Sequence, residues 1–385
     1  MIASLRAIAF ATILALPIAA KAQDVVTLGI VSATSGPLAA AGRFQLNGFN
    51  LALDKLNHDG GIDIGGKRRS VALKVYDTHC NPAEGASAME RLSSVDKVPV
   101  VLGELCSPVV AAETPVAQDN SIPFVITVPT AESLTLQGNP WVFRVNADNN
   151  QLNQALAKVV VNGAMSPLAF IAWNNDAGRG GVSSMQAQLP PDVKVAYTGY
   201  FNVGEVDFSA HITNIRRAGA KAIMLFMDEE PGALAIRQIR DAGLDAQLIG
   251  TLAMGSARFL TRLDAKYLAG MVQYNAFPPN APLPRVRAFD DAYKASFKEE
   301  SHGFAAQSYD ALLMVADALH RAGTATDGEA IRKALMSTGY DGVIGAIRFD
   351  THGQASPPVY VTQWCDNGTR RIIFPADLAS ACGGG

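Results

Sequence analysis

Short aliphatic runs that alternate with stretches of helical periodicity constrain the fold of this chain most strongly. The runs cover residues 25–31, 71–76, 98–103, 122–127, 168–173, 222–226 and 246–250. Uninterrupted apolar runs of this length are typical of strands that are buried on both faces of a parallel sheet. Because helical segments separate the runs, the sequence predicts an α/β fold with parallel sheets.

The helical segments are read from apolar spacing and from the residues that stop them. The first is marked by Leu46, Phe49, Leu53 and Leu56. Two late helices are expected at about 285–300 and 304–321. The runs 345–350 and 357–364 then predict a strand pair with a turn that closes the chain.

The number of strands indicates two lobes. A chain of 385 residues is too long for one ordinary core. One series of strand–helix units ends near residue 146 and a second series follows it, so we expect two doubly wound parallel-sheet lobes. Ligands of such sheets bind beyond the carboxyl ends of the strands.

The first 22 residues predict an export signal. Arg6 precedes an apolar stretch that closes on Ala20-Lys21-Ala22, the A-x-A form of a cleavage site. Residues 8–20 are fewer than the roughly 20 apolar residues that a membrane span needs. We therefore expect cleavage after Ala22 and a periplasmic protein. Removing Arg6 and Lys21 changes the formal charge from −3 to −5, which argues against a nucleic-acid partner.

Four cysteines fit an oxidising compartment. Cys80, Cys106, Cys365 and Cys382 allow three connectivities. Cys80 and Cys106 each follow an apolar run, which would place both at the same end of neighbouring parallel strands. We expect Cys80 to pair with Cys106, and Cys365 with Cys382.

Two motifs resemble functional sites, a phosphate-binding loop and a catalytic nucleophile, but each lacks residues that such a site needs. Residues 61–68, GIDIGGKR, mimic a phosphate-binding loop, but Arg68 replaces the Ser or Thr, and a helix precedes the segment where the motif needs a strand. A glycine-rich turn is the better interpretation. Cys106-Ser107 lacks a G-x-S-x-G context, and the six histidines form no metal motif. We expect neither an enzyme nor a cofactor.

Ser107 and Thr130 are the first candidates for binding a solute. Each follows an apolar run, where a strand gives way to a helix or turn. Helix N-termini suit anions because their first N–H groups lack partners, so a ligand carboxylate would be satisfied there. The alternative is that both hydroxyls are ordinary helix N-caps.

Several segments together resemble a known family: VTLGIVSATSGPLAAAG, LALDKLNHDGGI, KVYDTHCNPAEGA, VLGELCSPV, IPFVITVPTAESLT and IRQIRDAGLDAQLIG. They are similar to the leucine/isoleucine/valine-binding proteins, the type I periplasmic solute-binding proteins of ABC importers. The resemblance implies two lobes joined by three hinge strands that close over one solute. Lobe one would take residues 24–146 plus 277–346, and lobe two 147–276 plus 347–385. Cys80 and Cys106 match the family's disulfide.

The resemblance also implies a binding site. The family residues that hold an amino-acid carboxylate match Ser107 and Thr130, assisted by the backbone at Leu105 and near Pro129. A family Phe before the long late helix matches Phe304. The carboxylate half of the site therefore looks intact.

Other family positions differ here. Aromatic positions over the ligand fall on Ala41 and Ala177, which should leave a roomier cleft, and a Tyr position falls on Asp228. The family acid that binds the ligand ammonium falls on Leu252, so an ordinary aliphatic amino acid is in doubt. Asp228 would supply the missing charge, or else cap the helix near Pro231. Without it, the ligand would lack an ammonium, as an aromatic acid does.

The sequence thus predicts a monomeric solute-binding protein of an ABC importer that hands its ligand to the permease subunits. The ligand is a carboxylate, either an amino acid or a bulky aromatic acid. A ligand-sensing module of the same fold is the alternative, and a periplasmic enzyme is less favoured.

Overall fold

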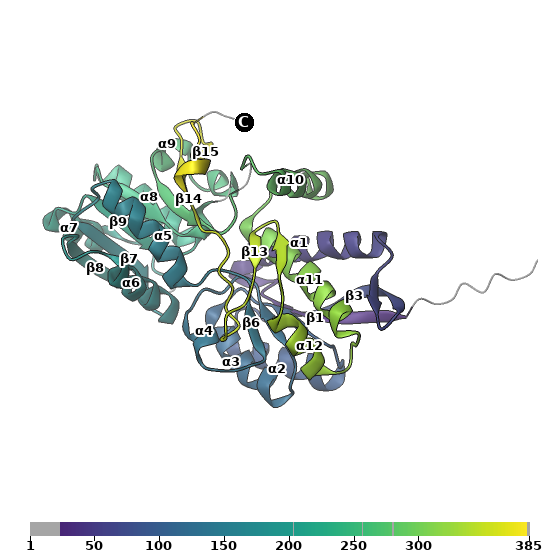
Figure 1. The fold of residues 1–385 in the computed structure, drawn as a ribbon. Coiled ribbons are helices and arrows are strands. Elements are labelled where there is room, and N and C mark those ends of the chain that lie inside the picture. The colour runs from purple at the N-terminus through teal and green to yellow at the C-terminus, as the bar shows by residue number, and fades with distance from the viewer. Residues whose placement is uncertain (1–23, 203, 256, 279–280, 383–385) are drawn as a thin grey trace, which may run out of the picture.

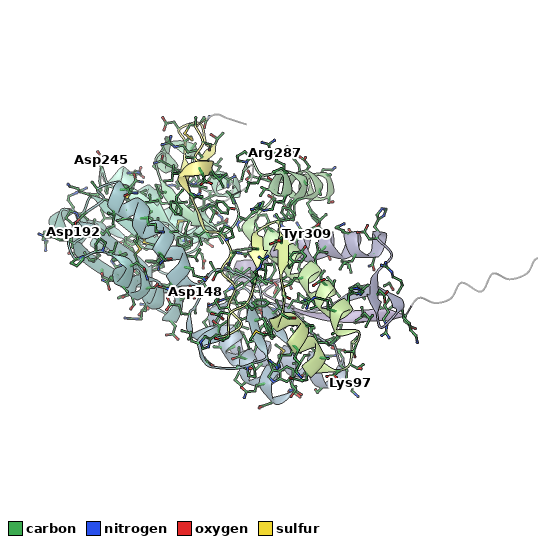
Figure 2. All side chains as sticks on the ribbon, viewed as in Figure 1. Lys97, Asp148, Asp192, Asp245, Arg287 and Tyr309 are labelled. Carbon is green, nitrogen blue, oxygen red and sulfur yellow. A yellow bond between two sulfur atoms is a disulfide. The ribbon has the colours of Figure 1, made fainter. Side chains whose placement is uncertain are left out.

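The computed structural model describes residues 24–202, 204–255, 257–278 and 281–382, arranged as two α/β lobes (Figure 1). The expected export segment and its cleavage point at Ala22 lie outside the described residues. Among the described residues, no helix combines the length and the apolar character needed to cross a membrane. Lys97 and Asp192 lie on opposite lobes, and Asp148 lies between the lobes (Figure 2).

The first sheet has the strand order β2-β3-β1-β4-β5-β6. Its strands are β1 (Val25–Ser32), β2 (Ile62–Ile64), β3 (Lys67–Asp77), β4 (Val101–Gly103), β5 (Phe124–Ile126) and β6 (Val142–Arg144). The helices around it are α1 (Ala39–His58), α2 (Pro82–Glu90), α3 (Ser107–Asp119), α4 (Ser133–Leu136), α10 (Pro284–Phe297), α11 (Gly303–Ala322) and α12 (Gly328–Met336). All neighbouring strands are parallel except β2 and β3.

The second sheet has the order β15-β14-β11-β10-β9-β7-β8. Its strands are β7 (Leu168–Trp173), β8 (Val195–Phe201), β9 (Ala222–Phe226), β10 (Gln247–Gly250), β11 (Val272–Asn275), β14 (Tyr360–Trp364) and β15 (Arg370–Phe374). Its helices are α5 (Asn149–Asn162), α6 (Asp176–Gln188), α7 (Ser209–Ala218), α8 (Glu229–Asp241) and α9 (Ala265–Leu268). Only β14 and β15 run antiparallel to their neighbours.

The predicted α/β fold is confirmed, because each of the seven apolar runs overlaps one of the strands β1, β3, β4, β5, β7, β9 and β10. The chain passes from one lobe to the other three times: after β6, after β11 to the helices α10–α12 that pack on the first lobe, and before β14. Their number matches the three hinge segments that the resemblance implies.

The predicted pairing at the end of the chain is wrong. Residues 345–347 form β13 (Gly345–Ile347), which pairs with β12 (Tyr340–Gly342), whereas β14 pairs with β11 and β15. The physical reason is that the intervening segment crosses between lobes, so the two runs belong to different lobes. An isolated bridge between Phe349 and Ala355 is the only local contact of the strand type within the described part of this segment.

Residues 61–68 form a β-hairpin rather than a phosphate loop. β2 pairs with β3 across Gly65 and Gly66, whose φ values of 62° and 78° are easily adopted by glycine. The predicted glycine-rich turn is therefore confirmed.

Both predicted disulfides are present. Cys80–Cys106 and Cys365–Cys382 have Cα–Cα distances of 5.7 and 5.8 Å. The strands that precede Cys80 and Cys106 are not neighbours, because β1 lies between β3 and β4. The bridge therefore spans the carboxyl end of β1 and ties together the loops that follow β3 and β4.

Candidate functional site

The loops after β4 and β5 carry the two candidate carboxylate ligands. The strands are parallel neighbours, with Gly103 opposite Ile126. Their carboxyl ends therefore lie at the same edge of the sheet. Ser107 is the first residue of α3, and Thr130 lies between β5 and α4.

Neither hydroxyl is a helix cap. Cys106 occupies the N-cap position of α3, and Glu132 occupies that of α4. Both Ser107 and Thr130 are half-buried, and within the described ranges no hydrogen bond of either hydroxyl is found. The N-cap alternative is thus wrong for both residues, and both hydroxyls are available to a bound molecule.

Glu104 organises the loop that carries Ser107, and sequence reasoning missed it. Its carboxylate is fully buried and accepts the N–H groups of Leu105 at 2.8 Å and Cys106 at 3.3 Å, while its other oxygen accepts the Thr78 hydroxyl at 2.8 Å. Burial raises the pKa of Glu104, and these hydrogen bonds oppose that rise. The available signal was an acid that interrupts an apolar run two residues before Cys106.

These hydrogen bonds limit what Leu105 can do. Its N–H already donates to Glu104, so only its carbonyl remains for a ligand. Gln45 fixes the same loop from α1, because its side-chain amide donates to the Glu104 carbonyl at 3.0 Å and to the Thr127 hydroxyl at 2.8 Å. The loops after β4 and β5 are therefore held together before any ligand arrives.

We expect Glu104→Ala to lower the free energy of unfolding by about 2 kcal/mol, because it leaves the Leu105 and Cys106 N–H groups without their acceptor. Urea denaturation measures this change. Glu104→Gln is the matched control, since its amide oxygen still accepts both N–H groups and should preserve most of the stability. Equal stability of the two variants would show that these hydrogen bonds do not hold the loop.

Asp228 lies at the carboxyl end of β9 in the second lobe. It occupies the N-cap position of α8, yet its side chain accepts no capping hydrogen bond. The side chain is reachable by solvent, while burial, together with the neighbouring Glu229 carboxylate, raises the pKa of Asp228 to about 6. A ligand can therefore reach the Asp228 carboxylate from solvent.

Phe304 and Leu252 lie where the lobes meet. Phe304, on α11, packs against the hydrophobic cores of both lobes. Leu252 is 8% exposed and belongs to the same second-lobe core as Tyr274. A Cβ atom at Gly303 would lie 3.4 Å from a Leu252 methyl group. Leu252 therefore packs against the start of α11.

Ala41 and Ala177 come from opposite lobes. Ala41 lies in the first turn of α1, and Ala177 is the second residue of α6. Both are half-buried, and each follows the carboxyl end of a strand, β1 or β7. The structure thus places these small residues at helix starts that follow parallel strands.

Two surface cavities lie apart from all these residues. One, of about 370 Å³, lies against α5, α6 and β15, and is lined by Lys158, Gln188 and Phe374 among others. The other, of about 410 Å³, lies beside the Cys365–Cys382 disulfide. Neither is lined by a candidate residue, so the candidate site rests on the strand ends and not on these cavities.

The Periplasmic binding protein family model matches residues 25–369. The chain belongs to this family. This periplasmic binding protein is 25% identical to the leucine-, isoleucine-, valine-, threonine- and alanine-binding protein of Pseudomonas aeruginosa, over 91% of this chain and 93% of that one. It is 24% identical to the Leu/Ile/Val-binding protein of Escherichia coli K12, with the same coverage. These relatives are solute-binding proteins by name.

Solved structures share the two-lobed fold. The branched-chain amino acid transporter substrate binding protein of Streptococcus pneumoniae, in complex with isoleucine, superposes with a TM-score of 0.83 at 23% identity, covering 91% of this chain and 99% of that one. An ABC transporter solute binding protein from R. palustris, in complex with benzoate, gives a TM-score of 0.82 at 18% identity, covering 93% and 98%. The fold inferred from the resemblance is confirmed.

Proposed function

We propose that this periplasmic binding protein traps a small carboxylate-bearing solute between its lobes and delivers it to the permease of an ABC importer, without chemistry of its own. The observation that carries the proposal is the pair of hydroxyls, Ser107 and Thr130, that lie at adjacent strand ends without serving as caps. On this proposal the protein is exported, is cleaved after Ala22 and acts as a monomer.

Closure would occur about the three passages between the lobes. The lobes would comprise residues 24–146 plus 277–346 and residues 147–276 plus 347–385. Phe304 supports this division, because it packs against both cores and so lies where the lobes meet. Small-angle X-ray scattering tests closure: saturating ligand should reduce the radius of gyration. An unchanged radius at saturation would contradict trapping between lobes.

Two ligand classes fit the site. A relative is named for binding leucine, isoleucine, valine, threonine and alanine, and a structure with the same fold holds benzoate. Leu252 offers no charge to an ammonium, and the small Ala41 and Ala177 side chains favour a bulky apolar body. Asp228 is the candidate partner for an ammonium, because its carboxylate accepts no cap bond. The two classes therefore differ in whether Asp228 takes part.

The pH dependence of affinity separates the two classes. For an amino acid, we expect affinity to fall as the pH drops below about 6, because the pKa of Asp228 is about 6 and its protonation removes the negative charge that attracts the ammonium. Calorimetric titration between about pH 5 and pH 8 measures this. Asp228→Asn should bind the amino acid weakly at every pH.

Benzoate has no ammonium and provides the internal control. Over the pH range in which benzoate itself stays ionised, the affinity for benzoate should not change as Asp228 becomes protonated. A constant affinity for amino acids across the same range would exclude Asp228 as the ammonium partner.

A further inference from the structure

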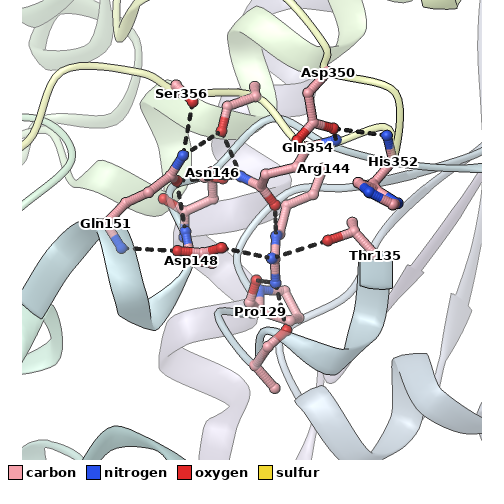
Figure 3. A network of polar contacts seen from close by, with 12 residues as sticks. Pro129, Thr135, Arg144, Asn146, Asp148, Gln151, Asp350, His352, Gln354 and Ser356 are labelled. Atoms are coloured by element: carbon pink, nitrogen blue, oxygen red, sulfur yellow. Dashed lines mark hydrogen bonds and ion pairs between the residues drawn. The ribbon is translucent and has the colours of Figure 1, made fainter. Parts of the chain in front are cut away.

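Arg144, the last residue of β6, is fully buried and lies in a polar network between the lobes (Figure 3). Its guanidinium donates to the Ala131 carbonyl at 2.6 Å, to the Thr135 hydroxyl at 3.3 Å and, at the outer limit, to the Pro129 carbonyl at 3.5 Å. The nearest acid is Asp148, at 3.7 Å. Burial lowers the pKa of Arg144 to about 10, so it stays charged at neutral pH.

The contacts to carbonyl groups orient the loop that contains Thr130. The Thr130 carbonyl also has a partner on this side, because it accepts the N–H of Asn149 at 2.9 Å. In a trans peptide unit the N–H points opposite to the C=O. With the carbonyls of residues 129–131 directed toward Arg144 and α5, the N–H groups of residues 130–132 are directed away from them. The loop therefore offers its donors on the opposite side.

The same arginine also connects two of the three passages between the lobes. Its backbone N–H donates to the Gly353 carbonyl at 2.8 Å, and its carbonyl accepts the Ala355 N–H at 2.9 Å. Its Nε donates to the Gln354 side chain at 2.5 Å, and the Gln354 amide in turn donates to the Asn146 carbonyl at 2.8 Å. Arg144 thus links the passage after β6 to the passage before β14 through both backbone and side-chain hydrogen bonds.

A guanidinium suits this position, since it presents five donors in a rigid planar fork. Here the donors are divided between the loop of Thr130 and the passage at Gln354. A lysine ammonium would keep the charge but not the geometry, so it could not serve both sides at once.

We propose that Arg144 is a positioning residue that couples the Thr130 loop to the hinge, so that the donors of the loop are aligned when the passages adopt their closed arrangement. The inference rests on the proposed function, because it assigns the loop to ligand binding. Arg144 would act through the loop carbonyls and would not contact the ligand.

The test compares Arg144→Lys with the parent in two measurements. Dyes attached through unnatural amino acids at the exposed positions Lys97 and Asp192, on opposite lobes (Figure 2), report the lobe separation by single-molecule energy transfer. Titration with L-leucine, L-isoleucine and benzoate gives the affinity. We expect Arg144→Lys to bind the parent's ligand about tenfold or more weakly and to broaden the distribution of lobe separations.

Two further variants keep the test decisive. Arg240→Lys is the matched control, because Arg240 also donates to backbone carbonyls, of Ala246 and Tyr267, but lies within the second lobe; it should bind like the parent. If Arg144→Lys does not fold, Gln354→Leu removes the side-chain partner of Arg144 in the passage before β14 and leaves the contacts of Arg144 to the loop. This variant should broaden the distribution in the same way.

A folded Arg144→Lys or Gln354→Leu protein with the parent's affinity and distribution of separations would overturn the proposal. If the parent binds none of the three probes, the ligand assignment fails. The distribution of lobe separations in the ligand-free proteins then still decides whether Arg144 restrains the hinge. The same distribution in the variant and the parent would overturn that role.

Discussion

The double substitution Ser107→Ala and Thr130→Ala is expected to weaken binding of a carboxylate ligand by about 3 to 6 kcal/mol, because each hydroxyl would donate one hydrogen bond to a charged group, worth roughly 1.5 to 3 kcal/mol. This corresponds to a loss of about two to four orders of magnitude in Kd. Both hydroxyls lie at adjacent strand ends and cap no helix, so their removal should cost little stability.

Calorimetric titration of L-leucine and benzoate into the parent and the variant measures this loss. Ser209→Ala is the matched control, because Ser209 is also the first residue of a helix, α7, but lies in the second lobe away from these loops. The control should bind like the parent. If the folded double variant binds as tightly as the parent, Ser107 and Thr130 do not form the carboxylate site.

Reducing the two disulfides is expected to lower the free energy of unfolding by about 3 kcal/mol for each, since each bridge restrains the unfolded chain over a loop of moderate length. The sequence separations are 26 residues for Cys80–Cys106 and 17 for Cys365–Cys382. For a lobe of this size, each bridge should contribute roughly 6 to 12 °C to the melting temperature. Ligand binding at lower temperature should persist, because the fold is retained there.

Paired variants separate the bridges. Cys80→Ala with Cys106→Ala should lose stability and some affinity, because Cys106 directly precedes Ser107. Cys365→Ala with Cys382→Ala should lose stability alone, since that bridge lies at the end of the chain in the second lobe. Calorimetric melting with and without reductant makes the comparison. A melting temperature that does not respond to reductant would contradict disulfide pairing in the purified protein.

The strands that could be predicted from sequence are those buried in apolar surroundings. β6, β8 and β11 were missed for a physical reason, because polar residues interrupt them. In β11, Gln273 and Asn275 are buried and donate to the Thr362 hydroxyl of β14. Such buried polar residues are tolerated only because a strand distant in sequence supplies their hydrogen-bond partners. The local pattern of apolar residues does not reveal that partner strand.

The residues of the candidate site also divide into those that the sequence predicted and those that it did not. Ser107 and Thr130 were predictable because each follows an apolar run and matches a family position. Glu104 and Arg144 were not, because their roles depend on contacts between separate segments: Glu104 with Thr78, and Arg144 with Ala131 and Gln354. An isolated charged residue in an apolar run is a signal that it is buried, but it does not reveal its partners.

The most direct measurement of the central claim is a thermal-shift screen of refolded, ligand-free protein against amino acids, their amides and aromatic carboxylates. A ligand that binds the folded state raises apparent stability by mass action. We expect at least one free acid to stabilise the protein and the amide of the same compound not to, because Ser107 and Thr130 need a carboxylate. Equal stabilisation by an acid and its amide would contradict a carboxylate site at Ser107 and Thr130. A screen in which no acid stabilises the protein would contradict it as well.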